Sequence, residues 1–339
     1  MSSLRIAHIA PVATTIPPPK SGSVETMTSL LTEGLVARGH DVTLFATGDS
    51  RTTAKLAAIY PHGYWHDQNM WPWELYEMLN LAAAVERASE FDISHYEAAY
   101  YPMSLAFARL SPTPIVQTLH HSPGAAEVKL WSRYPEAPFV AISNEQARLL
   151  AGLNIVETVL HGIDTTNFTF REKPDDYLLF LGRFTEGKGV LQAIDIARRV
   201  DMPLVLAAEA NDYYREKVAP LVDGTRVSYA GEVADGAKAA LLGGAAALLY
   251  PVQAGEPFGL VLAEATTCGT PVAALDRGAV REVVEDGVTG GVFDSLELLV
   301  AGLPRVLALD RTRVRDVAAE RFSVPRMVAG YEAVYRALR

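Results

Sequence analysis

The chain has 339 residues, of which 49% are hydrophobic, enough to build the cores of two domains. Its formal net charge is −10 at pH 7 and both halves are acidic, which argues against a nucleic-acid-binding protein and against docking on anionic lipid. The single cysteine, Cys268, excludes an internal disulfide and a cysteine-built metal site. We find no signal-peptide pattern and no transmembrane run, so a cytoplasmic location is expected.

Apolar runs typical of buried strands alternate with helical patterns along the first half of the chain. Residues 4–10 predict a strand, residues 25–38 a helix that Gly39 ends, and residues 41–46 the next strand. This alternation indicates a parallel sheet with helices on its faces. Further short strands are expected at residues 91–95, 115–119, 139–143 and 155–160.

A polar segment at residues 164–176 separates this half from a second alternation of the same kind. The sequence therefore predicts two doubly wound, Rossmann-like α/β domains, at residues 1–165 and 166–323, followed by an amphipathic helix at residues 324–339. Ligands of such sheets bind beyond the carboxyl ends of the strands. A ligand shared by both domains is expected in a central cleft that the two domains face.

The strongest candidate binding segment is residues 256–265, where a helix begins near Gly259 after a strand. Unpaired N–H groups and the helix dipole favour a phosphate there, and glycine lets the backbone approach it closely. Glu256 and Glu264 carry carboxylates that accept hydrogen bonds from vicinal hydroxyls, of a sugar and of a ribose. The alternative is an acidic residue that favours the helix dipole, together with a solvated glutamate. The Pro-Phe-Gly tripeptide between the two glutamates favours the binding site.

A second glycine-rich segment, residues 181–189, also follows a predicted strand and opens a helix. Arg183 and Lys188 bring two cations to this turn, which suits a pyrophosphate, because both side chains stabilise a leaving diphosphate. A solvated basic turn is the alternative.

A third segment, residues 17–25, lies between the first strand and the first helix. Gly22 and Ser23 would form another anion site at a helix N-terminus, and Glu25 would cap that helix. The alternative is an ordinary turn with an N-cap serine. The glycine spacing fits neither a Walker loop nor a dinucleotide fingerprint.

Three histidines are further candidates. His120 and His121 follow the predicted strand 115–119, where a side chain would reach the ligand. Structural or exposed roles are the alternative for this pair. His161 ends the last strand of the first half, where it would contact the diphosphate, and a simple hinge turn is the alternative. With one cysteine and no H-E-x-x-H pattern, no metal site is expected.

Three tryptophans, Trp65, Trp71 and Trp73, lie close together in the sequence. Aromatic rings could stack on an acceptor, and a small satellite core or a subunit contact is the alternative.

Taken together, these segments resemble those of the retaining glycosyltransferases of family 4, which have the GT-B fold. Residues 256–264 are similar to that family's E-x7-E signature, and residues 182–189 to its Arg/Lys phosphate loop. Residues 38–45, 264–273 and 282–290 match as well, so the resemblance covers almost the whole chain.

The resemblance implies a role for each matching residue of the second domain, which would be the donor side. Glu256 would hold the hydroxyls of the donor sugar, and Glu264 the ribose. The pyrophosphate would be bound by Arg183 and Lys188, together with the backbone of Gly259, Leu260 and Val261.

In the first domain, the acceptor side, the resemblance implies that Gly22 approaches the β-phosphate and that His120 lies beside the sugar or the acceptor. The last helix would cross back to this domain. Two positions depart from the family pattern: Ser23 stands where the family often has glycine, and His161 stands where it often has asparagine.

The implied activity is transfer of a hexose from a nucleotide-diphosphate sugar, with retention of the anomeric configuration and without a metal or other cofactor. UDP-glucose is the first expected donor, with GDP-mannose and UDP-N-acetylglucosamine as alternatives, and the acceptor would be a sugar or another small molecule. A disaccharide phosphorylase of the same fold and a non-catalytic nucleotide-sugar-binding protein are the competing hypotheses.

Overall fold

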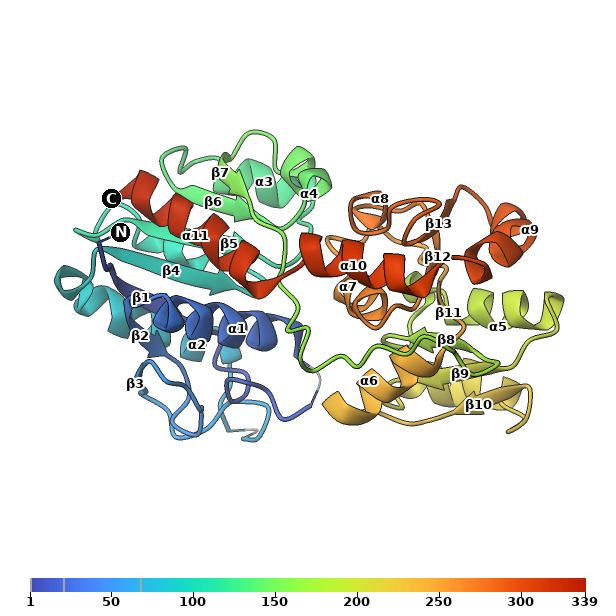
Figure 1. The fold of residues 1–339 in the computed structure, drawn as a ribbon. Coiled ribbons are helices and arrows are strands. Elements are labelled where there is room, and N and C mark those ends of the chain that lie inside the picture. Colours follow the sequence, from blue (N-terminus) through green and yellow to red (C-terminus); the bar gives the residue numbers. More distant parts are fainter. Residues whose placement is uncertain (1, 21, 68) are drawn as a thin grey trace. The chain divides into compact units, whose positions relative to one another are not determined.

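The structure is a computed structural model that describes residues 2–20, 22–67 and 69–339 (Figure 1). The chain forms two compact units, residues 1–162 with 324–339 and residues 163–323. Each unit is built on a parallel sheet with helices, so the predicted α/β class is confirmed. None of the helices among the described residues is long and apolar enough to cross a membrane.

The first unit has a seven-stranded sheet in the order β3-β2-β1-β4-β5-β6-β7. Because β1 and β4 are neighbours and the chain runs outward from each in opposite directions, the topological switch point lies between them. The strands are β1 (Arg5–Ile9), β2 (Asp41–Phe45), β3 (Lys55–Ala57), β4 (Ile93–Ala98), β5 (Ile115–Leu119), β6 (Pro138–Ala141) and β7 (Asn154–Thr158). The helices are α1 (Ser23–Ala37), α2 (Trp73–Glu86), α3 (Ala125–Trp131), α4 (Asn144–Leu149) and α11 (Val324–Leu338), with short 3-10 turns at Ala88–Glu90 and Met103–Ala106.

The two faces of this sheet differ in chemistry. On β1, Ala7 and Ile9 pack in an apolar core with Leu81 and Ala84 of α2. The side chain between them, His8, points to the opposite face and contacts α1. This opposite face is also the one that receives tyrosine side chains from α11, which packs against α1.

Buried polar contacts fix α11 on the first unit. Glu332 accepts a hydrogen bond from His40 Nε2 at 2.6 Å and pairs with Arg38 Nη2 at 2.8 Å. The other ring nitrogen of His40 accepts the backbone N–H of Leu4 at 3.0 Å, so Nε2 carries the hydrogen. One carboxylate therefore joins the last helix to the start of the sheet.

The second unit has a six-stranded sheet in the order β10-β9-β8-β11-β12-β13, with its switch point between β8 and β11. In its hydrophobic core, Phe180 and Leu249 of the sheet pack among side chains of the flanking helices. The strands are β8 (Leu178–Leu181), β9 (Leu204–Ala207), β10 (Val227–Tyr229), β11 (Ala247–Tyr250), β12 (Val272–Leu275) and β13 (Gly290–Phe293). The helices are α5 (Val190–Arg199), α6 (Asp235–Gly244), α7 (Leu260–Thr267), α8 (Val280–Val283), α9 (Leu296–Leu307) and α10 (Arg311–Arg321), with short turns at Glu186–Lys188, Tyr214–Val218 and Ala219–Leu221.

Two differences from the sequence prediction bear on the site. The strand predicted at residues 91–95 runs instead from Ile93 to Ala98, which places Glu97 inside the sheet. Trp73, treated above as part of an aromatic cluster, is the first residue of the helix α2, which the prediction did not include.

We expect Glu332→Ala to lower the free energy of unfolding by about 2–3 kcal/mol, because the buried Nε2–H of His40 loses its charged acceptor. Urea denaturation of the whole chain measures this loss. The control is Glu90→Ala, which removes an exposed pair with Arg87 and should leave the stability unchanged. Equal stabilities of Glu332→Ala and wild type would contradict the role of this carboxylate.

Candidate active site

In the second unit, the predicted donor residues gather at the switch point between β8 and β11. Arg183 lies two residues after the end of β8, and Lys188 ends the short turn that follows it. Glu256 lies in the loop that leaves β11 and precedes α7. The two glycine-rich segments, about seventy residues apart in the sequence, therefore meet at one edge of the sheet, as the carboxyl ends of neighbouring parallel strands must.

Glu256 is buried and lies at the centre of this group. Its Oε2 is 2.5 Å from Nζ of Lys188 and accepts a hydrogen bond from the hydroxyl of Tyr250. Lys188 Nζ also donates to the Tyr250 hydroxyl at 3.2 Å. Cation, phenol and carboxylate thus form a closed triangle, which holds the glutamate in a single orientation.

Two glycines make this triangle possible. A Cβ on Gly278, which has φ +65°, would lie 2.3 Å from the carbonyl oxygen of Glu256, and the next residue, Ala279, donates its N–H to that oxygen at 2.8 Å. A Cβ on Gly189, at φ +78°, would lie 1.9 Å from the carbonyl oxygen of Pro251. Only glycine allows both approaches of backbone to backbone.

Arg183 differs from Lys188 in having no carboxylate partner. It is exposed, and it forms no hydrogen bond or ion pair within the described ranges 2–20, 22–67 and 69–339. Burial raises the pKa of Tyr250 well above its usual value, the carboxylate of Glu256 raises it further, and the charge of Arg183 opposes both. The guanidinium is therefore near the triangle and free to bind an anion.

The start of α7 supplies backbone donors at the same place. Gly259 is the N-cap residue with φ +89°, and Leu260 and Val261 open the helix. Further along α7, Glu264 pairs with Nζ of Lys238 at 2.6 Å. Each glutamate of the E-x7-E signature thus has a lysine partner, of which the sequence prediction had included only Lys188.

The candidate residues of the first unit also lie at carboxyl ends of strands. Gly22 is the N-cap residue of α1, and Ser23 is its exposed first residue. The Glu25 carboxyl folds back over this helix end, where a Cβ on Gly22 would lie 2.9 Å from its Oε2. Burial raises the pKa of Glu25, and its interaction with His120 opposes that shift. Any phosphate at this helix end would have to share it with Glu25.

His120 and His161 stack on each other, with ring centroids 5.4 Å apart and an interplanar angle of 9°. Burial lowers the pKa of His161 to about 3, and the neighbouring His120 lowers it as well, so His161 is neutral and supplies no positive charge to a diphosphate. His120 Nε2 lies 2.7 Å from Oε2 of Glu97. The sequence prediction did not include Glu97, because the predicted strand 91–95 ended before this residue.

The three tryptophans do not share one environment. Trp73 packs with Tyr64 at 5.9 Å and is stacked on Tyr101 at 6.2 Å between ring centroids. Trp65 and Trp71 are 58% and 73% exposed. Their contact with an acceptor stays a prediction.

The sequence prediction also did not include Glu77, a buried residue of α2. Its Oε1 accepts the backbone N–H of Val12, just beyond the end of β1, at 3.1 Å. Burial raises its pKa to about 8, although hydrogen bonds from Val12 and Tyr64 oppose the shift. Glu77 is therefore largely protonated at neutral pH.

This raised pKa predicts how stability depends on pH. The folded chain keeps the proton of Glu77 up to about pH 8, whereas the unfolded chain releases it near the ordinary value of 4.5. The contribution of Glu77 to stability is thus complete below pH 4.5 and is lost as the pH rises through 8. We expect Glu77→Gln, which cannot ionise, to match wild type near pH 5 and to be more stable at pH 9, by on the order of 3 kcal/mol.

Thermal melts at both pH values measure the difference. Glu86→Gln, on the exposed side of the same helix, is the matched control and should behave as wild type at both. A Glu77→Gln variant that gains nothing between pH 5 and pH 9 would show that this carboxyl is ionised in the folded chain.

Comparison with known proteins agrees with this geometry. Residues 24–167 match the family described as Glycosyltransferase Family 4, and residues 164–320 match Glycosyl transferases group 1. The phosphatidyl-myo-inositol mannosyltransferase of Mycobacterium tuberculosis (strain CDC 1551 / Oshkosh) is 30% identical over 267 residues, which cover 70% of each chain.

Two solved structures show the same fold at lower identity. Sucrose-phosphate synthase from Thermosynechococcus elongatus superposes with a TM-score of 0.80 at 19% identity, over 98% of both chains. HepE of Anabaena, solved in complex with UDP-glucose, has a TM-score of 0.73 at 16% identity, over 99% of this chain and all of that one. The chain belongs to the family 4 (group 1) glycosyltransferases of GT-B fold, and it is a glycosyltransferase.

Proposed function

We propose that the enzyme transfers a hexose from a nucleotide-diphosphate sugar, with retention of configuration, and that the second unit binds the donor. The observation that carries this proposal is the triangle of Glu256, Lys188 and Tyr250 beside the unpaired Arg183 and the start of α7. It combines an oriented carboxylate, which suits sugar hydroxyls, with cations and backbone donors, which suit a diphosphate.

The chemistry follows from where charge develops. As the bond from the anomeric carbon to the diphosphate breaks, the leaving group gains negative charge and the sugar becomes oxocarbenium-like. Arg183, Lys188 and the backbone N–H groups at the start of α7 interact more strongly with the leaving group than with the intact donor, so they lower the barrier selectively. A phosphate oxygen of the leaving group would take the proton of the acceptor hydroxyl.

Pairing of the carboxylates supports a metal-independent reaction. Glu256 and Glu264 each form an ion pair with a lysine. Neither carboxylate is therefore left without a cation, as the carboxylates that hold Mg²⁺ with a nucleotide are. The role that a divalent cation has in other phosphate sites would be taken by Arg183 and Lys188.

UDP-glucose is the first candidate donor, supported by the complex of HepE with that sugar nucleotide. GDP-mannose is the next, supported by the mannosyltransferase among the relatives. The acceptor would be a sugar or another small molecule, bound by the first unit, and the reaction would take place in the cytoplasm. A thermal-shift screen of nucleotide sugars identifies the donor, because a ligand that binds only the folded chain raises its melting temperature.

We expect Arg183→Ala and Glu256→Ala each to reduce kcat/KM for donor consumption. For Arg183→Ala the loss of transition-state stabilisation should be about 2–4 kcal/mol, as for the loss of an oxyanion donor. Arg183→Ala should keep the melting temperature of wild type, because the side chain has no partner among the described residues. Lys188→Ala should lower it, because it leaves Glu256 buried without its cation.

Turnover is measured with the identified donor in excess chelator, and the anomeric configuration of the product by NMR. The matched control is Arg199→Ala at the far end of α5, whose side chain pairs with the exposed Asp195. Full activity of both Arg183→Ala and Glu256→Ala would disprove the site assignment, and loss of wild-type activity in chelator would disprove metal independence. Turnover that requires inorganic phosphate instead would indicate a phosphorylase, and a donor that binds without being consumed would indicate a binding protein.

A further inference from the structure

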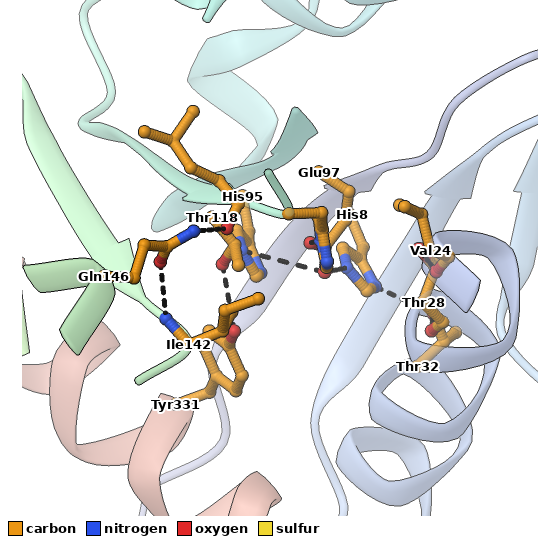
Figure 2. A network of polar contacts seen from close by, with 12 residues as sticks. His8, Val24, Thr28, Thr32, His95, Glu97, Thr118, Ile142, Gln146 and Tyr331 are labelled. Carbon is orange, nitrogen blue, oxygen red and sulfur yellow. Dashed lines mark hydrogen bonds and ion pairs between the residues drawn. The ribbon is translucent and has the colours of Figure 1, made fainter. Parts of the chain in front are cut away.

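A buried carboxylate, that of Glu97, joins several histidines at the switch point of the first sheet (Figure 2). Its Oε1 is 2.9 Å from Nε2 of His8, on the neighbouring strand β1, and its Oε2 is 2.7 Å from Nε2 of His120, which follows β5. His95, two residues earlier on β4, has its Nε2 3.8 Å from the same Oε1. Each carboxylate oxygen therefore has one close imidazole partner.

The charge state of Glu97 decides which way these hydrogen bonds run. Burial raises its pKa, but interactions with the imidazoles of His95, His120 and His8 lower it well below the usual value. An ionised carboxylate only accepts hydrogen bonds. Nε2 of His120 therefore carries a hydrogen and donates it to Glu97.

The remaining groups around His120 leave its second nitrogen open. Its ring is stacked on the neutral His161, and the titratable group of α1 that interacts with it is Glu25. The tyrosines of α11 bind other members of the network: the hydroxyl of Tyr335 contacts His95, and that of Tyr331 contacts Thr118. Within the described part of the chain, Nδ1 of His120 has no hydrogen-bond partner.

A metal ion is the competing explanation for this cluster, because ligand atoms of His8, His95 and Glu97 lie within 4.8 Å of one another. Every ring nitrogen of the two histidines is already used, however. Nδ1 of His8 lies 2.7 Å from Oγ1 of Thr32, and the nitrogens of His95 lie 2.7 Å from the Tyr335 hydroxyl and 2.8 Å from Oγ1 of Thr118. A cation would have to break these hydrogen bonds, so the geometry favours a hydrogen-bond network over a metal site.

We propose that Glu97 is the positioning residue of His120: it holds the hydrogen on Nε2 and the ring in one orientation, so that Nδ1 is left as a hydrogen-bond acceptor for a substrate hydroxyl. If the tautomers of His120 could exchange, Nδ1 would be a hydrogen-bond acceptor in one tautomer and a donor in the other. Only the acceptor form would bind the hydrogen of a substrate hydroxyl. The inference rests on the proposed function, together with the family resemblance, which implies that His120 lies beside the sugar or the acceptor.

The tautomer can be measured directly, without an activity assay. In long-range ¹H–¹⁵N spectra of histidine-labelled protein at pH 8, the protonated and unprotonated imidazole nitrogens have different ¹⁵N shifts, and His120→Gln identifies the signals of His120. We expect wild-type His120 to be protonated on Nε2 alone and Glu97→Gln to show a mixture of tautomers. The matched control Thr118→Val cuts the hydrogen bonds to His95 and Tyr331 and leaves Glu97 and His120 in place, so it should retain the wild-type tautomer of His120.

With the donor identified, Glu97→Gln should also reduce kcat/KM about 10- to 100-fold, the range found for partners that orient a functional histidine. Thr118→Val should keep the wild-type value. A wild-type His120 protonated on Nδ1, an unchanged tautomer in Glu97→Gln, or one equivalent of bound zinc by elemental analysis would overturn the inference.

These outcomes are distinct from failure of the proposed function. A chain that consumes no nucleotide sugar but shows the Nε2–H tautomer would contradict only the function, whereas active transfer with the opposite tautomer would contradict only the role of Glu97. If Glu97→Gln fails to fold, the spectrum of the wild-type protein still decides the tautomer.

Discussion

The buried pair of Glu256 and Lys188 is the interaction on which the donor site depends. A carboxylate taken out of water is costly unless a cation and further hydrogen bonds compensate it, and here Lys188 and the Tyr250 hydroxyl do so on a single oxygen. The second oxygen, Oε1, has no partner in this triangle and is the one available to a ligand. Lys188, which stabilises Glu256 in the free enzyme, would also bind the diphosphate when the donor is present.

Both units use the switch point of their sheet in the same way. In the second unit, neighbouring strands bring two glycine-rich loops together around a carboxylate; in the first, they bring histidines together around another. The difference lies in what surrounds them. Glu256 is paired with a lysine that reaches solvent, whereas Glu97 is buried in the sheet and its two oxygens contact the rings of His8 and His120. The first arrangement can exchange partners with a ligand, and the second is suited to hold one side chain still.

Much of this could be predicted from the sequence, because the features concerned are local. The alternation of apolar runs predicted both sheets, and the resemblance of residues 256–264 and 182–189 to segments of the family implied a nucleotide-sugar site. Tyr250 was beyond such reasoning: as the last residue of an apolar strand it is indistinguishable from a core residue, and its role appears only when the following loop folds back onto it. Lys238, which pairs with Glu264 from another helix, is a long-range contact of the same kind.

Glu97 shows the opposite difficulty. The predicted strand stopped at His95, whereas the structure continues it to Ala98. The imidazoles of His8 and His120 compensate the buried charge of Glu97 there. The sequence prediction also missed the helix α2, because Trp71 and Trp73 at its start were interpreted as part of an aromatic cluster.

The central claim, that Arg183 and Lys188 bind a diphosphate, is tested most directly by calorimetric titration of the chain with a nucleoside, its monophosphate and its diphosphate, without metal. The account predicts that the diphosphate binds at least about tenfold more tightly than the monophosphate, a gain of about 1.4 kcal/mol. It also predicts that this gain disappears in Arg183→Ala. Equal affinities for the three ligands, or a preference for the diphosphate that appears only with added Mg²⁺, would contradict it.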